Sequence, residues 1–537
     1  MDRRTFLLSM AASPLLMHCQ RSTGITYSGD LLGPDHVAGH ALVKGDFPVF
    51  TQTKRSKVVI VGGGISGLSA AWHLQSQGMH DFTLLELEAA VGGNARSGRN
   101  SISPYPWGAH YLPVPNHENL LLKQLLAETG VIVSGYDSER PQYHERYLCY
   151  APQERLYIHG QWQEGLRPTH GLTKQEHADI NAFEQQMQYF RQARGKDGKP
   201  AFAIPLNSSS TDSEFQALDK INMSDYLLEQ GWHSKPLHWY VNYACRDDYG
   251  VPAGQISAWA GIHYFASRRG QAANAETDQV LTWPQGNAWL AGQLASKQQA
   301  HTHTRQLAHS ITLEKHGVTL DVLDLNTQQT TRWLTDQVIY ASPAHTLPYV
   351  LRNAADIAQA ARSIQHAPWL VANISLNNAD ILNANLPTAW DNVLYDSAGL
   401  GYVVANHQNL QQHPAQSVIT YYHAVTLRDS SSARKQLYTQ TWQALSKQVT
   451  QDLQHAHPHI AQAITHMDIW RWGHAMTSPR PGFLSDNQRL RLNNQTRYPR
   501  LHIAHTDAAG ISIFEEAFAQ GVEAATRCLS TSQRLSK

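Results

Sequence analysis

The sequence predicts an α/β fold in which a Rossmann-like domain is joined to a mixed α+β domain. Three observations lead to this prediction. A strand–helix–strand pattern occupies residues 57–85, further strand-like and helix-like stretches alternate after it, and 42% of the 537 residues are hydrophobic, which is ample for sizeable cores. Length alone leaves the number of domains open.

The composition excludes several classes of protein. Lys plus Arg and Asp plus Glu each number 43, so no basic surface for nucleic acid is predicted. Four cysteines without a CxxC pair exclude a disulfide scaffold and give no zinc-site pattern. The chain also lacks the GxSxG, HExxH and P-loop motifs of hydrolases and kinases. We therefore expect no nucleic-acid partner and no metal.

The N-terminus has the layout of a targeting segment. Arg3 and Arg4 precede an apolar run, residues 6–17, that is too short to span a bilayer. The order Arg-Arg-x-Phe-Leu resembles a twin-arginine signal, so we expect residues 1–22 to be a signal peptide and the protein to be periplasmic. The alternative is a buried N-terminal helix. Met17 and His18 replace the small residues usual before a lipidated cysteine, and a membrane contact is expected only if Cys19 is lipidated.

The first regular elements follow an extension, residues 23–55, that lacks clear periodicity. Residues 57–61 form a short apolar run that ends in glycines, residues 65–77 have a helical pattern, and residues 82–85 form a second apolar run. Two strands joined by a helix over about 30 residues predict a βαβ unit in a buried parallel sheet.

The turn between the first strand and the helix fits the dinucleotide fingerprint G-x-G-x-x-G. Gly62 permits the tight turn, Gly64 allows a diphosphate to approach the backbone, and Gly67 allows helix and strand to pack closely. Glu86 lies about twenty residues beyond Gly67, where an acidic residue binds a ribose diol, and it is preferred to Glu88, which lies past the strand end. The predicted nucleotide-binding residues are Gly62, Gly64, Ile65, Ser66, Gly67 and Glu86.

A second glycine pair, Gly92-Gly93, indicates FAD rather than NAD. At this point the chain resembles the flavin-containing amine oxidase superfamily, which includes carotenoid desaturases and protoporphyrinogen oxidases. That superfamily has G-G-R where this chain has Gly92-Gly93-Asn94, followed by Arg96. The resemblance implies that these four residues lie near FAD, with Arg96 reaching a phosphate or the flavin.

The resemblance extends to three later segments, residues 283–290, 336–343 and 503–525. The last resembles the second flavin motif, in which Asp507 would contact the ribityl–phosphate linkage and Gly521 lies in the helix that follows. The resemblance implies a discontinuous FAD domain made of residues 56–112, 275–350 and 490–537. Residues 113–274 and 351–489 would form the substrate domain.

Aromatic and histidine side chains are candidates for the substrate side. Trp107, His110 and Tyr111 follow the glycine pair in a region that returns along the flavin in the resembling family. Trp470 and Trp472 alternate as on a strand, with His474 as a candidate proton acceptor. Aromatic walls attract a cationic amine. The alternative for each is ordinary packing.

Residues 243–250 combine aromatic and charged side chains around Arg246, Asp247 and Asp248. Arg246 with either aspartate would orient a polar substrate or form a buried ion pair. A carboxylate pair acting as acid and base is disfavoured if this segment is a strand, because adjacent strand residues point to opposite faces.

These features together predict an FAD-dependent oxidoreductase that moves a hydride from a substrate C–H bond, in an amine, to flavin N5. The electron acceptor would be oxygen or another molecule. FAD is expected to be noncovalent, since no cysteine lies between Cys245 and Cys528. The alternatives are a polyene or tetrapyrrole oxidase of the same superfamily and a non-catalytic FAD-binding assembly factor. An apolar tunnel would favour the first of these, and an aromatic pocket with a carboxylate would favour an amine.

Overall fold

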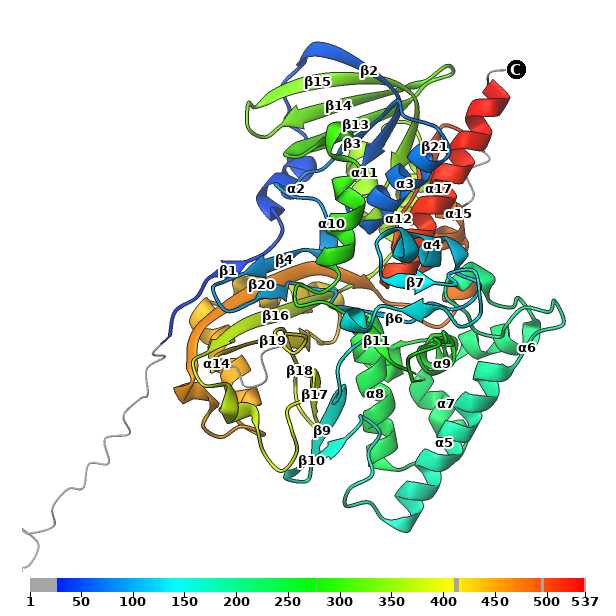
Figure 1. Ribbon diagram of the computed structural model, residues 1–537. Coiled ribbons are helices and arrows are strands. Elements are labelled where there is room, and N and C mark those ends of the chain that lie inside the picture. Colours follow the sequence, from blue (N-terminus) through cyan, green and yellow to red (C-terminus); the bar gives the residue numbers. More distant parts are fainter. Residues whose placement is uncertain (1–26, 277, 410–414, 494–496, 536–537) are drawn as a thin grey trace, which may run out of the picture.

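The computed structural model describes residues 27–276, 278–409, 415–493 and 497–535 (Figure 1). The predicted signal peptide and Cys19 lie outside the described residues. Within the described part of the chain, no helix is long and apolar enough to cross a membrane.

The first sheet contains the predicted βαβ unit, in the upper half of Figure 1. Strands β2 (Phe50–Val61) and β3 (Phe82–Leu85) are parallel and are joined by helix α3 (Ile65–Ser76). Strand β2 begins at Phe50 rather than at residue 57. Its first half is exposed and polar, so it lacks the apolar run that marks its buried second half.

Segments far apart in the sequence complete this sheet. Its strand order is β12-β3-β2-β15-β14-β13, and β21 pairs with β15. Strand β15 lies parallel to both β2 and β21, so three separated parts of the chain share one parallel core. The added strands are β12 (Thr302–His303), β13 (Gln306–Leu313), β14 (Val318–Asp324), β15 (Gln329–Tyr340) and β21 (Leu501–Ile503). The apolar pattern of residues 311–322 predicts a single strand, and this prediction is wrong, because Gly317 lies between the antiparallel strands β13 and β14.

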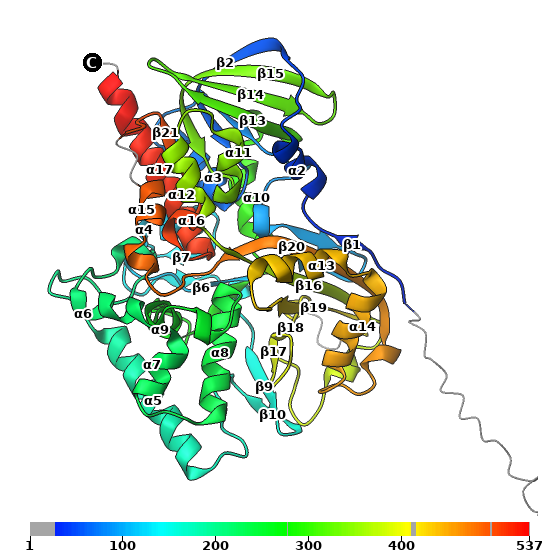
Figure 2. The same cartoon turned by 180° about the vertical axis from the view of Figure 1, so that it is seen from behind.

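A second sheet of eight strands lies beside the first (Figures 1 and 2). It is mostly antiparallel, and β16 contacts β19 on one side and β20 on the other. In spatial order the strands are β1 (Leu31–Leu32), β20 (Ile464–Thr477), β16 (His366–Leu376), β19 (Ser417–Ala424), β18 (Gly401–Val404), β17 (Asp391–Leu394), β9 (Glu154–Ile158) and β10 (Gln161–Glu164).

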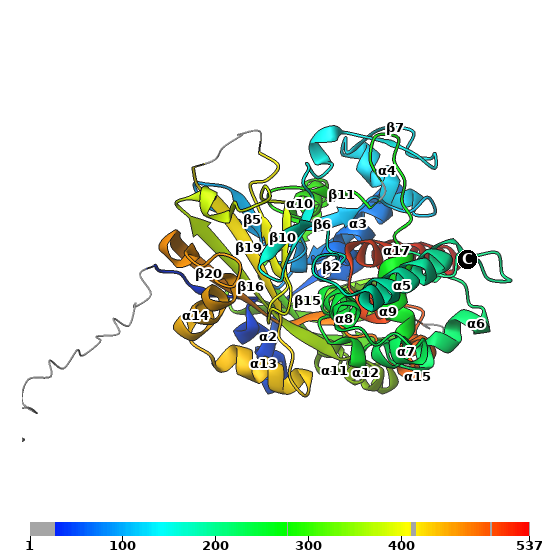
Figure 3. The same ribbon diagram turned by 90° about the horizontal axis from the view of Figure 1, so that it is seen from below.

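A group of helices lies next to this second sheet, and Figure 3 shows α5, α7, α8 and α9 together. These helices share one apolar core with aromatic residues of β16, β19 and β20. The group consists of α5 (Lys174–Gln192), α6 (Ser213–Gln216), α7 (Met223–Glu229), α8 (Lys235–Tyr249) and α9 (Ala258–Ala266). The second sheet and these helices therefore form the mixed α+β part of the molecule.

The remaining elements cover the two sheets or connect them. The sequence pattern predicts one helix over residues 433–455, and the structure has two there, α13 and α14, separated at residues 440–441. The other helices are α2 (His36–Lys44), α4 (Leu120–Glu128), α10 (Ala288–Ser296), α11 (Leu347–Val350), α12 (Ala355–Arg362), α13 (Ser430–Thr439), α14 (Trp442–Leu453), α15 (Asn487–Asn493), α16 (Thr506–Ala509) and α17 (Phe514–Leu535). The short strands are β4 (Ser97–Arg99), β5 (Pro104–Pro106), β6 (Tyr111–Pro113), β7 (Ile132–Ser134), β8 (Gln142–Tyr143) and β11 (Val280–Thr282).

Candidate active site

The glycine turn after β2 has the geometry that its sequence predicts. Gly62 has φ +109°, and a Cβ on Gly67 would lie 1.9 Å from the carbonyl oxygen of Gly62. Gly64 precedes α3 and places no capping side chain on the helix, and a Cβ there would meet only the Cα of Gly93, at 3.9 Å. The first N–H groups of α3 therefore have no capping side chain and Gly64 adds no bulk before them, which suits a diphosphate.

Glu86 holds this turn in place from the end of β3. Its carboxylate accepts hydrogen bonds from the N–H groups of Gly63 (2.6 Å) and Glu88 (2.8 Å). Burial raises the pKa of Glu86, and the two N–H groups oppose that rise. Each carboxylate oxygen has a second lone pair, so the side chain can still accept from a ribose hydroxyl.

The second glycine pair lies against the first turn. Gly92 donates its N–H to the carbonyl of Gly63 (2.8 Å), and Gly92 and Gly93 both have positive φ angles. Asn94 donates to the carbonyl of Ala475 (2.7 Å) and so links this loop to β20. Arg96 forms an ion pair with Glu88 (3.1 Å) and lies over the ring of Trp470, which restrains its guanidinium.

The C-terminal motif contributes two of the predicted residues. Asp507 is buried, lies 2.8 Å from His366 Nε2 and accepts the N–H of Ala344 (2.7 Å). Burial alone would raise the pKa of the Asp507 carboxyl. The charge of His366 is the largest influence in the other direction, and this pKa is well below its usual range. Gly521 lies where α17 crosses α3, and a Cβ there would be 2.1 Å from the carbonyl oxygen of Ser66. Close helix packing alone therefore explains this glycine.

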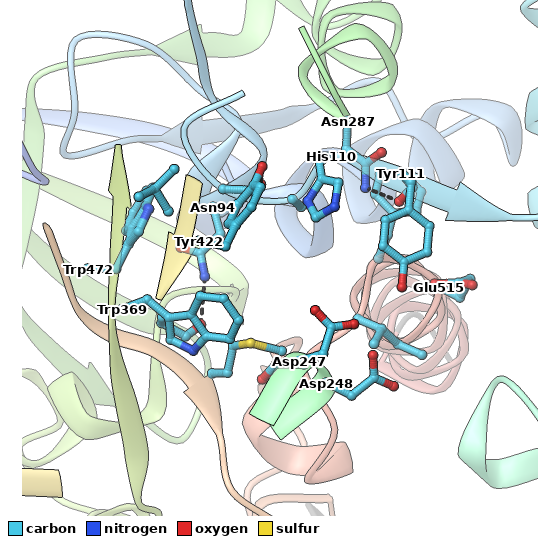
Figure 4. A pocket seen from close by; sticks show the side chains of 18 of the residues that line it. Asn94, His110, Tyr111, Asp247, Asp248, Asn287, Trp369, Tyr422, Trp472 and Glu515 are labelled. Atoms are coloured by element: carbon cyan, nitrogen blue, oxygen red, sulfur yellow. Dashed lines mark hydrogen bonds between the residues drawn. The ribbon is translucent and has the colours of Figure 1, made fainter. Parts of the chain in front are cut away.

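A cavity of about 150 Å³ lies between these loops, the second sheet and α8 (Figure 4). Of the residues that the sequence singles out, the cavity is lined by Asn94, His110, Tyr111, Asp247, Asp248 and Trp472. Trp107, Trp470 and His474 do not line it. Its lining also includes residues that the sequence did not single out, namely Arg268, Asn287, Trp369, Tyr422, Phe514 and Glu515.

Aromatic rings form the wall on the side of the second sheet. Trp369 of β16 and Trp472 of β20 are cross-strand neighbours, and Tyr422 of β19 stacks on His110 with ring centroids 4.5 Å apart. Tyr422 donates its hydroxyl to the carbonyl of Gly108 (3.0 Å), which fixes the ring. Burial lowers the pKa of His110 to about 4, so its imidazole is neutral near pH 7.

Carboxylates lie on the opposite side of the cavity, as Figure 4 shows. Arg268 Nη2 lies 2.9 and 2.8 Å from the two carboxylate oxygens of Asp248, so this carboxylate is paired. Asp247 has no hydrogen-bond partner for its carboxylate among the described residues, and burial together with Asp248 raises its pKa. Burial also raises the pKa of Glu515, to about 7. Asp247 and Glu515 are therefore the carboxylates of the cavity without a side-chain partner among the described residues, and Asp247 is the less buried of the two.

The argument against an Asp247–Asp248 pair assumed a strand and does not apply, because residues 235–249 form helix α8. Pro236 lies in its first turn, and Gly250 ends it with φ +71°. Asp247 and Asp248 both line the cavity. Arg246 pairs with neither of them and donates to the carbonyls of Ala398 and Gly399.

Trp107, Trp470 and His474 pack against other aromatic rings outside the cavity lining. Trp107 stacks on Trp470 with ring centroids 4.0 Å apart. His474 stacks on His345 at 3.9 Å, and burial followed by the charges of His345 and Arg434 lowers its pKa to about 2. A histidine that is this hard to protonate is a poor proton acceptor. The cavity wall in β20 is instead formed by Trp472, Ala475 and Met476.

Residues 65–529 match the family described as flavin containing amine oxidoreductase. The chain belongs to this family. Its cofactor is therefore FAD, and the predictions of an α/β fold, of FAD and of the FAD-dependent oxidoreductase class are confirmed at the level of the family and fold.

Solved structures of similar fold cover most of the chain. Putrescine oxidase bound to putrescine is 13% identical, with a TM-score of 0.63 over 89% of this chain and 100% of that one. Cyclohexylamine oxidase from Brevibacterium oxydans IH-35A is 14% identical, with a TM-score of 0.63 over 90% and 100%. A fatty acid isomerase from P. acnes that produces CLA is 16% identical, with a TM-score of 0.62 over 88% and 98%. At these identities the likeness shows the fold alone.

Curated relatives match only a short segment. A Baeyer-Villiger monooxygenase of Penicillium patulum, peniC, is 36% identical over 97 residues, which are 17% of this chain and 14% of that protein. The mitochondrial pyruvate dehydrogenase phosphatase regulatory subunit of Mus musculus is 38% identical over 82 residues, 15% of this chain and 9% of that protein. The chain therefore spans a small part of the curated relatives that it matches.

The described residues fit FAD at the glycine turns. Gly62, Gly64, Gly67, Gly92 and Gly93 leave a backbone cradle in front of α3. Glu86 lies beneath it, at the position expected for a ribose ligand. Asn94 and His110 continue from this cradle to the cavity.

Glu86→Ala is expected to weaken FAD binding by roughly 1–3 kcal/mol, because a ribose hydroxyl and the N–H of Gly63 both lose a buried acceptor. The measurement is the FAD dissociation constant of the reconstituted protein. Glu139→Ala, at an exposed position, serves as the control. Equal FAD affinity in wild type and Glu86→Ala would show that Glu86 is not the ribose ligand.

Proposed function

We propose that the protein oxidises a small amine at the cavity, with FAD as the electron acceptor. The observation that supports this most strongly is Asp247, a carboxylate without a partner that faces a cavity walled by Trp369, Tyr422 and Trp472. A carboxylate attracts an ammonium group, and aromatic faces attract the same cation. Two of the structures of similar fold carry the names of amine oxidases.

The residues of the cavity would each have a different role in binding the amine. Asp247 would hold the ammonium and accept its proton, since its raised pKa makes it a stronger base than an ordinary aspartate. Asp248 stays paired with Arg268 and does not compete for the amine. The aromatic walls orient the carbon chain and exclude water. Bound FAD would supply the two-electron acceptor for the C–H bond next to nitrogen.

The size of the cavity supports a small substrate. At about 150 Å³ it is smaller than the 300–1,000 Å³ or so that is typical of pockets for drug-sized ligands. A tetrapyrrole or a polyene would need more room, and Asp247 and Glu515 offer a polyene no polar partner. Oxygen or another molecule would reoxidise the flavin.

Anaerobic titration of the FAD-loaded protein with a series of alkylamines tests this function. We expect loss of the visible flavin absorbance, slowed when the carbon next to nitrogen carries deuterium. A flavin that dithionite reduces and that none of the amines reduces would contradict the proposal. That outcome would favour a non-catalytic FAD-binding assembly factor.

We further propose that the protein is exported in its folded state. A buried dinucleotide must be inserted before export, and Arg3-Arg4 matches the pathway that carries folded proteins. Replacing both arginines with lysine is expected to retain the FAD-loaded protein in the cytoplasm. Cell fractionation measures this, and unchanged export of the double variant would reject the twin-arginine route.

A further inference from the structure

We propose that residues 27–49, here called the strap, help to retain FAD by positioning the Glu88 carboxylate and, through it, Arg96 and the second glycine pair. Asp35 and Glu88 are then positioning residues and not catalytic ones. The inference concerns the cofactor alone, so it is independent of the amine oxidation proposed above.

The strap runs from the second sheet to the first, as β1 and α2 show in Figures 1 and 2. At one end, β1 pairs in parallel with β20, and Met467 donates its N–H to the carbonyl of Ser28 (2.9 Å). At the other end, Phe47 stacks on His309 of β13 with ring centroids 4.1 Å apart, and β2 follows. The strap is therefore attached to both halves of the molecule.

Between these ends the strap contacts the loop that contains the second glycine pair. Asp35, the N-cap residue of α2, donates its backbone N–H to one carboxylate oxygen of Glu88 (2.8 Å). The side chain of Asp35 pairs with Arg305 (2.9 Å) and accepts the N–H of Ala38 (3.0 Å). Because these contacts fix Asp35, the N–H that it offers to Glu88 has a defined position.

Glu88 connects the strap to the glycine loop. Its other carboxylate oxygen pairs with Arg96 (3.1 Å), and the two side chains are only 16% and 10% exposed, so water screens this ion pair little. Arg96 also donates through Nε to the carbonyl of Gly93 (3.2 Å). Gly93 packs closely on the first turn, since a Cβ on it would lie 3.2 Å from the Cα of Gly64. Two side chains therefore link the strap to the predicted diphosphate cradle.

The strap sets the direction of the Glu88 carboxylate and not the path of the chain. The backbone of Glu88 is held separately, because Arg305 donates its N–H to the carbonyl of Glu88 (3.1 Å). Loss of the strap contact should therefore speed FAD release and leave the fold in place. If the seated strap tightens FAD binding, bound FAD must stabilise the seated strap by the same factor.

Gly29→Ala tests the inference far from the glycine turns, because its new Cβ would lie 1.8 Å from the carbonyl oxygen of Met467 and separate the strap from β20. We expect the FAD-loaded variant to release FAD about ten-fold faster than wild type, the factor for losing a hydrogen bond to a charged group. Flavin fluorescence after dilution measures the rate. Asp35→Ala should act in the same direction. Gly39→Ala on α2 is the matched control, since a Cβ there meets nothing within 4 Å, and it should release FAD at the wild-type rate.

Two further measurements distinguish positioning from a merely structural role. Amide hydrogen exchange of residues 27–49 should be slower in FAD-loaded than in FAD-free wild type, because the coupling is reciprocal. Glu88→Ala should itself release FAD about ten-fold faster, and adding Gly29→Ala to it should cause no further change, because both act through one carboxylate.

Equal FAD release from wild type, Gly29→Ala and Asp35→Ala would overturn the inference. Faster release from Gly39→Ala would also overturn it, because that substitution leaves the strap in place. The same holds for hydrogen exchange in the strap that FAD does not change, and for fully additive effects of Gly29→Ala and Glu88→Ala. Amine oxidation is tested separately by flavin reduction, so either proposal can fail without the other.

Discussion

Asp247→Asn is expected to remove most of the amine-dependent flavin reduction while leaving FAD bound. The variant keeps the shape of the side chain and loses the charge that would hold the ammonium. Truncating one partner of a buried charge pair costs about 2–5 kcal/mol. The flavin-reduction rate divided by the dissociation constant should therefore fall by the factor that corresponds to this free energy. Anaerobic rapid mixing measures it.

Asp46→Asn provides the matched control for this variant, because Asp46 is exposed on the part of the chain before β2. It should reduce flavin at the wild-type rate. Equal rates in wild type and Asp247→Asn would show that Asp247 has no part in the proposed mechanism. A loss of FAD from Asp247→Asn would instead indicate a structural role.

Gly67→Ala is expected to prevent accumulation of FAD-loaded protein. The new Cβ would lie 1.9 Å from the carbonyl oxygen of Gly62, which is backbone and cannot move aside like a flexible side chain. Overpacking of this kind costs roughly 1–3 kcal/mol or more, and the displaced turn would no longer fit a diphosphate. The measurement is the FAD content and thermal unfolding midpoint of the purified variant.

Gly292→Ala on α10 is the control for the glycine variant, because a Cβ there meets nothing within 4 Å. A glycine replaced by alanine in an unstrained helix raises stability by about 0.4–1 kcal/mol. This control should therefore bind FAD normally and unfold no earlier than wild type. Normal FAD content in Gly67→Ala would contradict the packing role of Gly67.

The nucleotide-binding half of the site could be predicted because its determinants are local. Gly62, Gly64 and Gly67 are each required by a turn or a close approach within one βαβ unit, and Glu86 ends the next strand. Such constraints appear as fixed spacings in the sequence. Asp247 stands out in the sequence, but the argument against its pairing with Asp248 assumed that the segment is a strand. Pro236 and Gly250 are helix start and stop signals that would have corrected this.

The aromatic wall depends on contacts between distant parts of the chain. Trp369, Tyr422 and Trp472 come from three strands whose pairing no short window encodes, although the alternation of Trp470 and Trp472 indicated a strand. Asp35 and Glu88 meet only because the strap crosses the loop after β3. The composition of each segment leaves those partners open, so this contact could be recognised only in the fold.

The structure of the FAD-loaded protein with a bound amine tests the central claim most directly. We expect the amine nitrogen within hydrogen-bonding distance of Asp247, between the flavin and the rings of Trp369 and Tyr422. An amine bound away from the cavity, or a cavity filled by the protein's own side chains when FAD is present, would contradict the account.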